Sequence, residues 1–340
     1  MWSPATEAGQ PRHHKSKTWR NSGVSKEKQS VGFIGVGLMG HGMAKNIVEK
    51  GYPLSVMGHR NKKPVKDLVK RGAKEAKSAA AMARDCDVIF LCVTSSLQVE
   101  DLIRRADGIK AGAHKGLIIV DCSTADPNST LALAAELKPL GVSLIDAPLG
   151  RSPKEAELGR LNAMVGADPK TLKEVRPIME TWAENIIHVG PVGAGHKIKL
   201  INNFISLSFA ATFAEAYTAA KKTGVPLEKL YDVVSAGGMN SGFFQNVSKW
   251  VIGRDPKAHE FTLANCLKDI SYYNQMVNAE KLTTMVSSAV QQDYTMALAM
   301  GRGDQHMPML ADAIANFNGL DLAEKPKKPG TAKAKSKMKK

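Results

Sequence analysis

Residues 32–46 read Gly-Phe-Ile-Gly-Val-Gly-Leu-Met-Gly-His-Gly-Met-Ala-Lys-Asn, and this stretch decides the fold. A short apolar run enters a glycine-rich turn, and a helical pattern follows at once. The spacing is that of a dinucleotide-binding turn: the first glycine permits the tight turn, the second admits a pyrophosphate, and the third lets the helix pack against the strand. The N–H groups and dipole of the new helix favour the phosphate charge. The alternative is a glycine-rich surface turn. The cofactor residues predicted here are Gly35, Gly37, Leu38, Met39 and Gly40.

Strand-like and helical segments alternate from residue 31 to about residue 190. Strands are expected at 31–35, 54–57, 88–93, 117–121, 143–146, 162–165 and 186–189. Helical stretches between them include 63–70, 79–84, 129–140 and 169–181. This alternation predicts a largely parallel sheet with helices on both faces, an α/β Rossmann-type domain over residues 31–192.

The character of the chain changes at the sequence Val192-Gly-Ala-Gly195. Residues 196–223 are rich in Ala and Leu and predict one long helix, which Gly224-Val-Pro226 ends. Further helices are expected at 227–234, 261–277 and 284–300, and no convincing strand follows residue 196. We therefore expect an all-helical domain over residues 193–322, joined to the first domain by the long helix, with a ligand cleft between them.

The net charge of +15 is concentrated at the two ends of the chain. Residues 1–30 carry a net +4 and residues 325–340 a net +8, which leaves +3 for residues 31–324. Residues 1–30 and 323–340 are therefore predicted to be disordered basic tails. Such tails could grip an anionic polymer weakly, but we expect no nucleic-acid partner for the folded body.

The four cysteines form no Cys-x-x-Cys pair, and no secretory signal opens the chain. They are expected to be reduced thiols of a cytoplasmic protein. No apolar run is long enough to predict a membrane span. No cluster of His, Asp and Glu has metal-ligand spacing, so no metal site is expected.

The segment after the second strand indicates which dinucleotide binds. In this fold, an acidic residue near the end of that strand binds the ribose hydroxyl of NAD. Here no acid is present, and cationic side chains that suit a 2′-phosphate stand in its place. The sequence therefore predicts NADP in preference to NAD; the alternative is that these are only solvated loop cations. The residues assigned to the 2′-phosphate end of the cofactor are His59, Arg60, Asn61, Lys62 and Lys63.

Polar side chains follow other strands at the edge where open α/β sheets bind their ligands. Val93 and Thr94, where the third strand ends, are assigned to the cofactor site. Ser123 and Thr124 follow the fourth strand and are assigned to the substrate. Their hydroxyls could also cap the next helix.

Four motifs occur in order: Gly35-x-Gly-x-Met-Gly40, Asp121-x-Ser-Thr-x-x-Pro127, Asp146-Ala-Pro148 and Gly193-x-Gly-x3-Lys-Leu-x-Asn-Asn203. Together they resemble the β-hydroxyacid dehydrogenases, the family of 3-hydroxyisobutyrate dehydrogenase and tartronate semialdehyde reductase. The resemblance covers about residues 31–320. It implies reversible hydride transfer between a nicotinamide and a 3-hydroxy acid or its aldehyde, and a homodimer or homotetramer.

The resemblance also implies roles for three residues. Lys199 would be the catalytic lysine, acting as general acid and base, and an ammonium aimed at a developing alkoxide suits that role. Asn203 would orient the substrate and the lysine, and Lys268 would lie near the nicotinamide. The alternative for Lys199 is an ordinary lysine on a helix surface.

One segment departs from the family pattern. Most members continue Asp-Ala-Pro-Val-Ser-Gly-Gly, whereas this chain has Gly150, Arg151 and Ser152 in place of the Ser-Gly-Gly carboxylate cradle. The change resembles the sulfolactaldehyde reductase branch, as do Asn202 and Ser206, which share a helix face. These residues are assigned to an anionic substrate, a sulfonate or a carboxylate aldehyde. In the alternative, Arg151 pairs with Glu155 or Glu157 and only shapes the loop. Gly58, where that branch has an acid, argues against close functional identity.

Two functions from different classes remain open. The first is an NAD(P)-dependent β-hydroxyacid dehydrogenase or semialdehyde reductase. The second is a nucleic-acid-associated protein that keeps a dehydrogenase domain as a scaffold, which the basic tails suggest. Such scaffolds usually lose the catalytic lysine, and Lys199 is present, so the enzyme is preferred.

Overall fold

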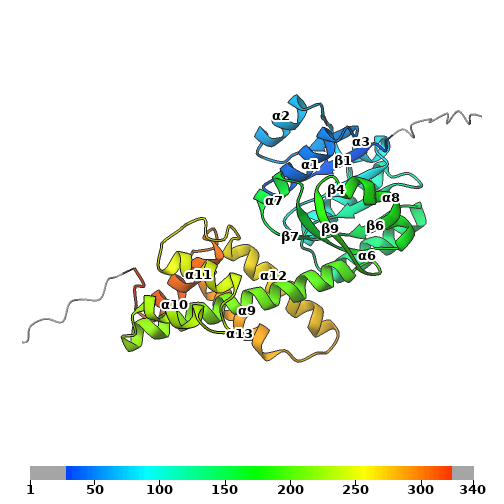
Figure 1. Ribbon diagram of the computed structural model, residues 1–340. Coiled ribbons are helices and arrows are strands. Elements are labelled where there is room, and N and C mark those ends of the chain that lie inside the picture. Colours follow the sequence, from blue (N-terminus) through cyan, green and yellow to red (C-terminus); the bar gives the residue numbers. More distant parts are fainter. Residues whose placement is uncertain (1–27, 324–340) are drawn as a thin grey trace, which may run out of the picture.

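The computed structural model describes residues 28–323, and most of both predicted tails lies outside these residues. A sheet with helices around it forms the first part, and a helical part follows (Figure 1). The sheet order is β3-β2-β1-β4-β5-β6-β8-β7, with β9 beside β8. The strands are β1 (Val31–Ile34), β2 (Leu54–Met57), β3 (Lys74–Glu75), β4 (Val88–Leu91), β5 (Ile118–Asp121), β6 (Ser143–Asp146), β7 (Leu149–Gly150), β8 (Leu161–Gly166) and β9 (Ala183–Gly190).

The central strands are apolar on both faces because helices cover both sides of a parallel sheet. Every residue of β1 and β4 is buried. Val31 lies opposite Leu54 of β2 on one side and Val88 of β4 on the other, all in parallel register. Strands β6 and β7 pair antiparallel to β8, so the expectation of a largely parallel sheet is correct with this exception.

Eight α-helices and one 3₁₀ helix, η1 (Lys138–Leu140), accompany the sheet in the described residues. The α-helices are α1 (Gly40–Glu49), α2 (Lys63–Lys70), α3 (Ala79–Asp85), α4 (Ser96–Arg104), α5 (Ile109–Gly112), α6 (Pro127–Leu137), α7 (Pro153–Glu157) and α8 (Pro169–Met179). Two separate clusters of buried apolar side chains pack around the sheet, one with Phe33, Phe90 and Trp182, the other with Met82 and Ile89.

The helical part is built around one 30-residue helix, α9 (Ala194–Thr223), which runs out of the sheet domain in Figure 1. Glycines in the left-handed conformation stand at both its ends, Gly193 and Gly224. The other helices are α10 (Leu227–Ser235), α11 (Gly242–Val251), α12 (Leu263–Ala279), α13 (Met285–Ala299) and α14 (Leu310–Phe317). They bury a third apolar cluster against α9, which includes Tyr217 and Phe244.

Several boundaries differ from the sequence-based expectations. The expected strand 88–93 ends at Leu91, and the chain then turns into the loop of Val93 and Thr94. Helix α6 begins at Pro127 because the Asp126 side chain accepts from the Asn128 amide at 3.0 Å, so neither Ser123 nor Thr124 is the cap. Past residue 196, the described residues hold no strand and one isolated bridge, between Thr262 and His306.

Candidate active site

The glycine turn has the shape that a dinucleotide needs. Gly35 has φ +97°, and a Cβ there would lie 2.2 Å from the Cys92 carbonyl oxygen. A Cβ on Gly40 would lie 2.1 Å from the Gly35 oxygen, whereas a Cβ on Gly37 would meet no atom within 4 Å. Helix α1 begins without a side-chain cap. The first and third glycines thus close the turn, while the second faces open space beside free helix amides, which fits a pyrophosphate.

The other residues assigned to the turn lie around it. Leu38 is 77% exposed, and Met39 packs against the buried cluster of the sheet. The loop after β4 runs alongside, because a Cβ on Gly35 would also come within 3.1 Å of Val93. The Val93 amide donates to Ser123 Oγ at 3.0 Å, and the Thr94 amide to Gln98 Oε1 at 2.8 Å. The cofactor loop and the predicted substrate loop are therefore directly connected.

The loop after β2 is exposed and cationic. No hydrogen bond or ion pair in residues 28–323 engages the side chains of His59, Arg60 or Lys63. Lys62 pairs with Glu75 at 2.8 Å, and Asn61 Oδ1 accepts from the Lys63 amide at 3.0 Å. A Cβ on Gly58 would lie 2.6 Å from Val65 Cγ2, so the packing of α2 also opposes an acidic side chain at that position.

Lys199 lies on α9, half-buried, near a buried carboxylate. Burial lowers the pKa of Lys199, the charge of Asp269 opposes this shift, and Lys268 adds to it. Asn203, one turn further along, donates from Nδ2 to Asp269 Oδ2 at 2.6 Å and accepts from Asn202 Nδ2 at 3.3 Å. Both ends of the Asn203 amide are thus engaged within the protein.

Lys268 connects α12 to the sheet domain. Its Nζ donates to the Thr124 carbonyl oxygen at 2.9 Å and lies 2.7 Å from Asp269 Oδ1. The ammonium also lies 5.1 Å from the centre of the Tyr272 ring, whose hydroxyl accepts from the Ser96 amide at 3.3 Å. The structure therefore brings Lys199, Asn203, Lys268 and the Ser123–Thr124 loop into one cluster across the two domains.

The start of α9 is anchored by a fully buried carboxylate, Asp146. It accepts from the Gly193 amide at 2.6 Å and from the His196 amide at 2.8 Å. A Cβ on Gly195 would lie 2.4 Å from the Met164 oxygen and 2.8 Å from Asp146 Oδ2, so only glycine fits there. Burial raises the pKa of Asp146, and these hydrogen bonds and His196 oppose the shift.

Arg151 does not join this cluster through any contact in the described residues. Its guanidinium pairs with Glu184 on β9 and donates to the Arg160 carbonyl oxygen at 2.5 Å, and its backbone has φ +77°. Neither Glu155 nor Glu157, the partners considered from the sequence, holds it.

Those two glutamates are engaged elsewhere. Glu155 forms a capping box with Ser152, and Glu157 pairs with His41 at 2.7 Å and Lys45 at 2.9 Å. Gly150 pairs with Asn162 of β8.

The two further substrate residues lie along α9. Asn202 is exposed, Ser206 is half-buried, and Ser206 Oγ donates to the Asn202 carbonyl oxygen at 2.9 Å. They share a side of the helix, as their spacing predicted.

Two residues that contact the cluster, Asp269 and Tyr272, were not predicted from the sequence. Asp269 follows Lys268 directly, and that adjacency was an available signal. Tyr272, one turn beyond Lys268, belongs to no sequence motif, and only its hydrogen bond with the Ser96 amide in the structure links it to the site.

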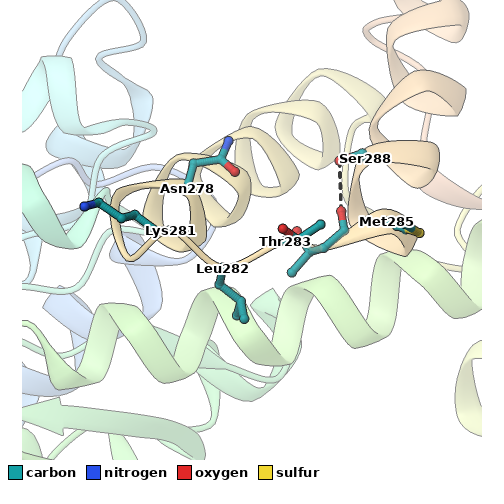
Figure 2. Close-up of a pocket in the computed structure, with 7 residues that line it drawn as sticks. Asn278, Lys281, Leu282, Thr283, Met285 and Ser288 are labelled. Atoms are coloured by element: carbon teal, nitrogen blue, oxygen red, sulfur yellow. Dashed lines mark hydrogen bonds between the residues drawn. The ribbon is translucent and has the colours of Figure 1, made fainter.

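Hollows elsewhere do not coincide with this cluster. Figure 2 shows one at the turn between α12 and α13, about 570 Å³ in volume, and Lys281, Leu282 and Met285 are among the residues that line it. None of the predicted site residues lines it.

Within residues 28–323, no group of three or more His, Cys, Asp or Glu could hold a metal ion. The same part of the chain contains no helix that could cross a membrane.

Known families match both halves of the chain. Residues 30–190 match the NAD binding domain of 6-phosphogluconate dehydrogenase, and residues 193–314 match the model described as NAD-binding of NADP-dependent 3-hydroxyisobutyrate dehydrogenase. An uncharacterized oxidoreductase of Synechocystis sp. is 32% identical over 241 residues, 71% of this chain and 83% of that protein. The chain belongs to the 3-hydroxyisobutyrate dehydrogenase-type family of β-hydroxyacid dehydrogenases. It is therefore an NAD(P)-dependent oxidoreductase that acts on a CH–OH group.

Other members of the family show how far the likeness extends. The 3-sulfolactaldehyde reductase of Escherichia coli (strain K12) is 28% identical over 293 residues, 86% of this chain and 97% of that enzyme. The structure of Mycobacterium tuberculosis 3-hydroxyisobutyrate dehydrogenase with L-serine superposes with a TM-score of 0.75, at 24% identity over 84% of this chain and 99% of that one. The predicted family and the two-part fold are thus confirmed.

Proposed function

We propose that this β-hydroxyacid dehydrogenase interconverts a small anionic aldehyde and its 3-hydroxy acid, prefers NADP, and uses Lys199 as general acid and base. The observation that carries the proposal is the cluster of Lys199, Asn203, Asp269 and Lys268 against the loop of Ser123 and Thr124. When bound, the nicotinamide supplies or accepts the hydride. The glycine turn would hold the pyrophosphate, and the uncommitted cations His59, Arg60 and Lys63 would hold a 2′-phosphate.

In the direction of reduction, the protonated Nζ of Lys199 donates its proton to the carbonyl oxygen. Its positive charge stabilises the alkoxide that develops there. In the reverse direction, the neutral amine takes the proton from the hydroxyl. Burial lowers the pKa of Lys199, which eases release of the proton from the ammonium and suits a general acid.

The test is a screen of the purified chain. NADPH and NADH oxidation would be followed with glyoxylate, succinic semialdehyde, tartronate semialdehyde, methylmalonate semialdehyde and sulfolactaldehyde. We expect turnover with at least one of them, and a higher kcat/KM for NADPH than for NADH. No turnover across the panel would overturn the substrate class, and a preference for NADH would overturn the cofactor assignment alone.

We propose further that Arg151 releases Glu184 when substrate enters and binds the anionic group of the substrate in its place. The Arg151–Glu184 pair is partly exposed, and such pairs contribute only about 0–1 kcal/mol. Glu184 engages only one nitrogen of the guanidinium, whereas a sulfonate or carboxylate can accept from two, so the exchange gains a second hydrogen bond.

Two variants test this exchange. R151M should raise KM about tenfold for an anionic aldehyde and leave KM unchanged for an uncharged one, whereas E184Q should lower KM for the anion. Equal effects of R151M on both aldehydes would show that Arg151 only shapes the loop.

We also propose that the chain forms a homodimer or homotetramer. Four large apolar side chains lie exposed along one side of α9: Ile198, Ile201, Ile205 and Phe209. At 100° per residue they form one stripe, which a second subunit would cover.

We also propose a cytoplasmic location, which is supported by four cysteines that are all free thiols. The nucleic-acid-associated alternative rests on tails outside the described residues, and nothing in the comparisons supports it.

A further inference from the structure

His196 is a fully buried histidine in the first turn of α9, three residues before Lys199. Its Nε2 lies 3.1 Å from the Ser123 carbonyl oxygen, and its Nδ1 lies 2.8 Å from Thr130 Oγ1. The ring has no exposed surface, so it does not reach the substrate. It is a titratable group that the reaction proposed above leaves unused.

Both ring nitrogens of His196 have a hydrogen-bond partner. A carbonyl oxygen can only accept, so Nε2 carries the proton and donates to Ser123. The Thr130 hydroxyl lies 2.8 Å from Nδ1, and its oxygen also lies 3.2 Å from the Asp126 carbonyl oxygen. Every polar atom of the ring is satisfied, and the ring is held at both ends.

The bond to Ser123 joins two loops to the helix of the catalytic lysine. Ser123 Oγ accepts from the Val93 amide at 3.0 Å, so the same residue also holds the cofactor loop. The next carbonyl, that of Thr124, accepts from Lys268 at 2.9 Å. Two consecutive carbonyls are therefore held by side chains from two helices of the helical domain, α9 and α12.

The backbone of His196 cannot move to compensate for a lost contact. Its amide donates to the buried Asp146 carboxylate at 2.8 Å, and Gly195 is packed against Met164 and Asp146. With the helix start fixed, the length and direction of the His196 side chain determine how far the Ser123–Thr124 loop lies from α9 and Lys199.

We propose that His196 is a positioning residue that sets the distance between Lys199 and the loop of Ser123 and Thr124. Because proton and hydride transfer depend on a near-attack geometry, a displacement of about 1 Å can cost on the order of 10²-fold in rate. The inference rests on the proposed function, since it assumes that Lys199 and this loop act on one substrate.

A pair of variants separates the two ring contacts. In H196Q the amide nitrogen reaches about as far as Nε2 and keeps the donor to Ser123. In H196N the shorter amide reaches only to the position of Nδ1 and loses that bond. We expect kcat within about threefold of the natural chain for H196Q and reduced about tenfold or more for H196N.

T130V is the matched control, because it removes the Nδ1 partner and leaves the Ser123 bond. It should lower Tm as H196N does but keep kcat. Equal kcat for H196N and H196Q, or a loss of kcat in T130V as large as in H196N, would overturn the positioning role. A natural chain that turns over nothing in the aldehyde panel would instead overturn the proposed function and this inference with it.

Discussion

Lys199 is subject to two opposing influences, and their balance determines when it can donate a proton. Burial and Lys268 lower the pKa of Lys199, while the carboxylate of Asp269 raises it. Asp269 is itself held by Asn203 at 2.6 Å and Lys268 at 2.7 Å. The charge that opposes the lowering of the Lys199 pKa is thus held in place by two residues of the same cluster.

Removing that charge should shift the pH profile in a defined direction. D269N removes the group that raises the pKa of Lys199, so the lysine would lose its proton at a lower pH. Reduction needs the protonated form, and we expect its kcat to decline at lower pH than in the natural chain. Measuring kcat against pH for both proteins tests this.

N203A is the control, because it removes the amide and keeps the carboxylate. It should lower kcat without moving the profile. A D269N profile that matches the natural one, or moves to higher pH, would contradict the assigned role of Asp269.

At this level the sequence predicted individual residues better than their partners. Lys199, Asn203 and Lys268 were found from motifs, and the structure places them together. The partner of Arg151 was not found, because Glu155 and Glu157 lie close in sequence but already hold Ser152 and His41. Glu184 is distant in sequence, and β9 brings it within reach.

Secondary structure was predicted well where the sequence has a clear pattern, as at the glycine turn between β1 and α1, and poorly where it has none. The glycines of that turn predicted a strand, a turn and a helix, and the structure has β1, the turn and α1 in those places. The two-residue strands β3 and β7 were not predicted, since two residues are too short to show a pattern. Helices α11 and α14 were not predicted either. Their apolar residues are buried by packing against α9, which the sequence pattern does not show.

Two alanine substitutions should separate the roles of the glycines. A methyl on Gly37 enters open space, so G37A should keep its Tm and weaken NADPH binding. A methyl on Gly40 would lie 2.1 Å from the Gly35 oxygen and 2.9 Å from Phe33, so G40A should lose about 1–3 kcal/mol of stability. Thermal unfolding and NADPH titration of both variants check this. Unchanged NADPH affinity in G37A would show that the pyrophosphate lies elsewhere.

In the molecule as a whole, α9 connects the two domains and contributes Lys199 and Asn203 to the cluster between them. Its first turn is anchored to the sheet by Asp146, and its remainder forms the axis of the helical part (Figure 1). Contacts of Lys268 with Thr124 and of Tyr272 with Ser96 hold the domains together beside it. The sequence predicted this two-part plan, but not the contacts between the parts, which arise only from tertiary packing.

The exposed stripe on α9 leads to a prediction about assembly. Carboxylates in an apolar subunit interface are costly to bury, so I201D/I205D should convert the oligomer to single chains. Light scattering on the eluted protein measures the mass. K173D, an equal charge change on an exposed residue of α8, should leave the mass unchanged. An I201D/I205D variant with the mass of the natural assembly would show that the stripe is not the interface.

Two lysines on the same helix allow the role of Lys199 to be separated from that of a surface charge. Lys199 faces the cluster, whereas Lys197, two residues earlier, is exposed. Transfer of deuterium from deuterated NADPH to the accepted aldehyde would be measured for K199M and K197M. We expect a loss of kcat of about 10²-fold or more for K199M and none for K197M, with NADPH Kd unchanged in both. A K199M variant that transfers deuterium at the natural rate would contradict the account.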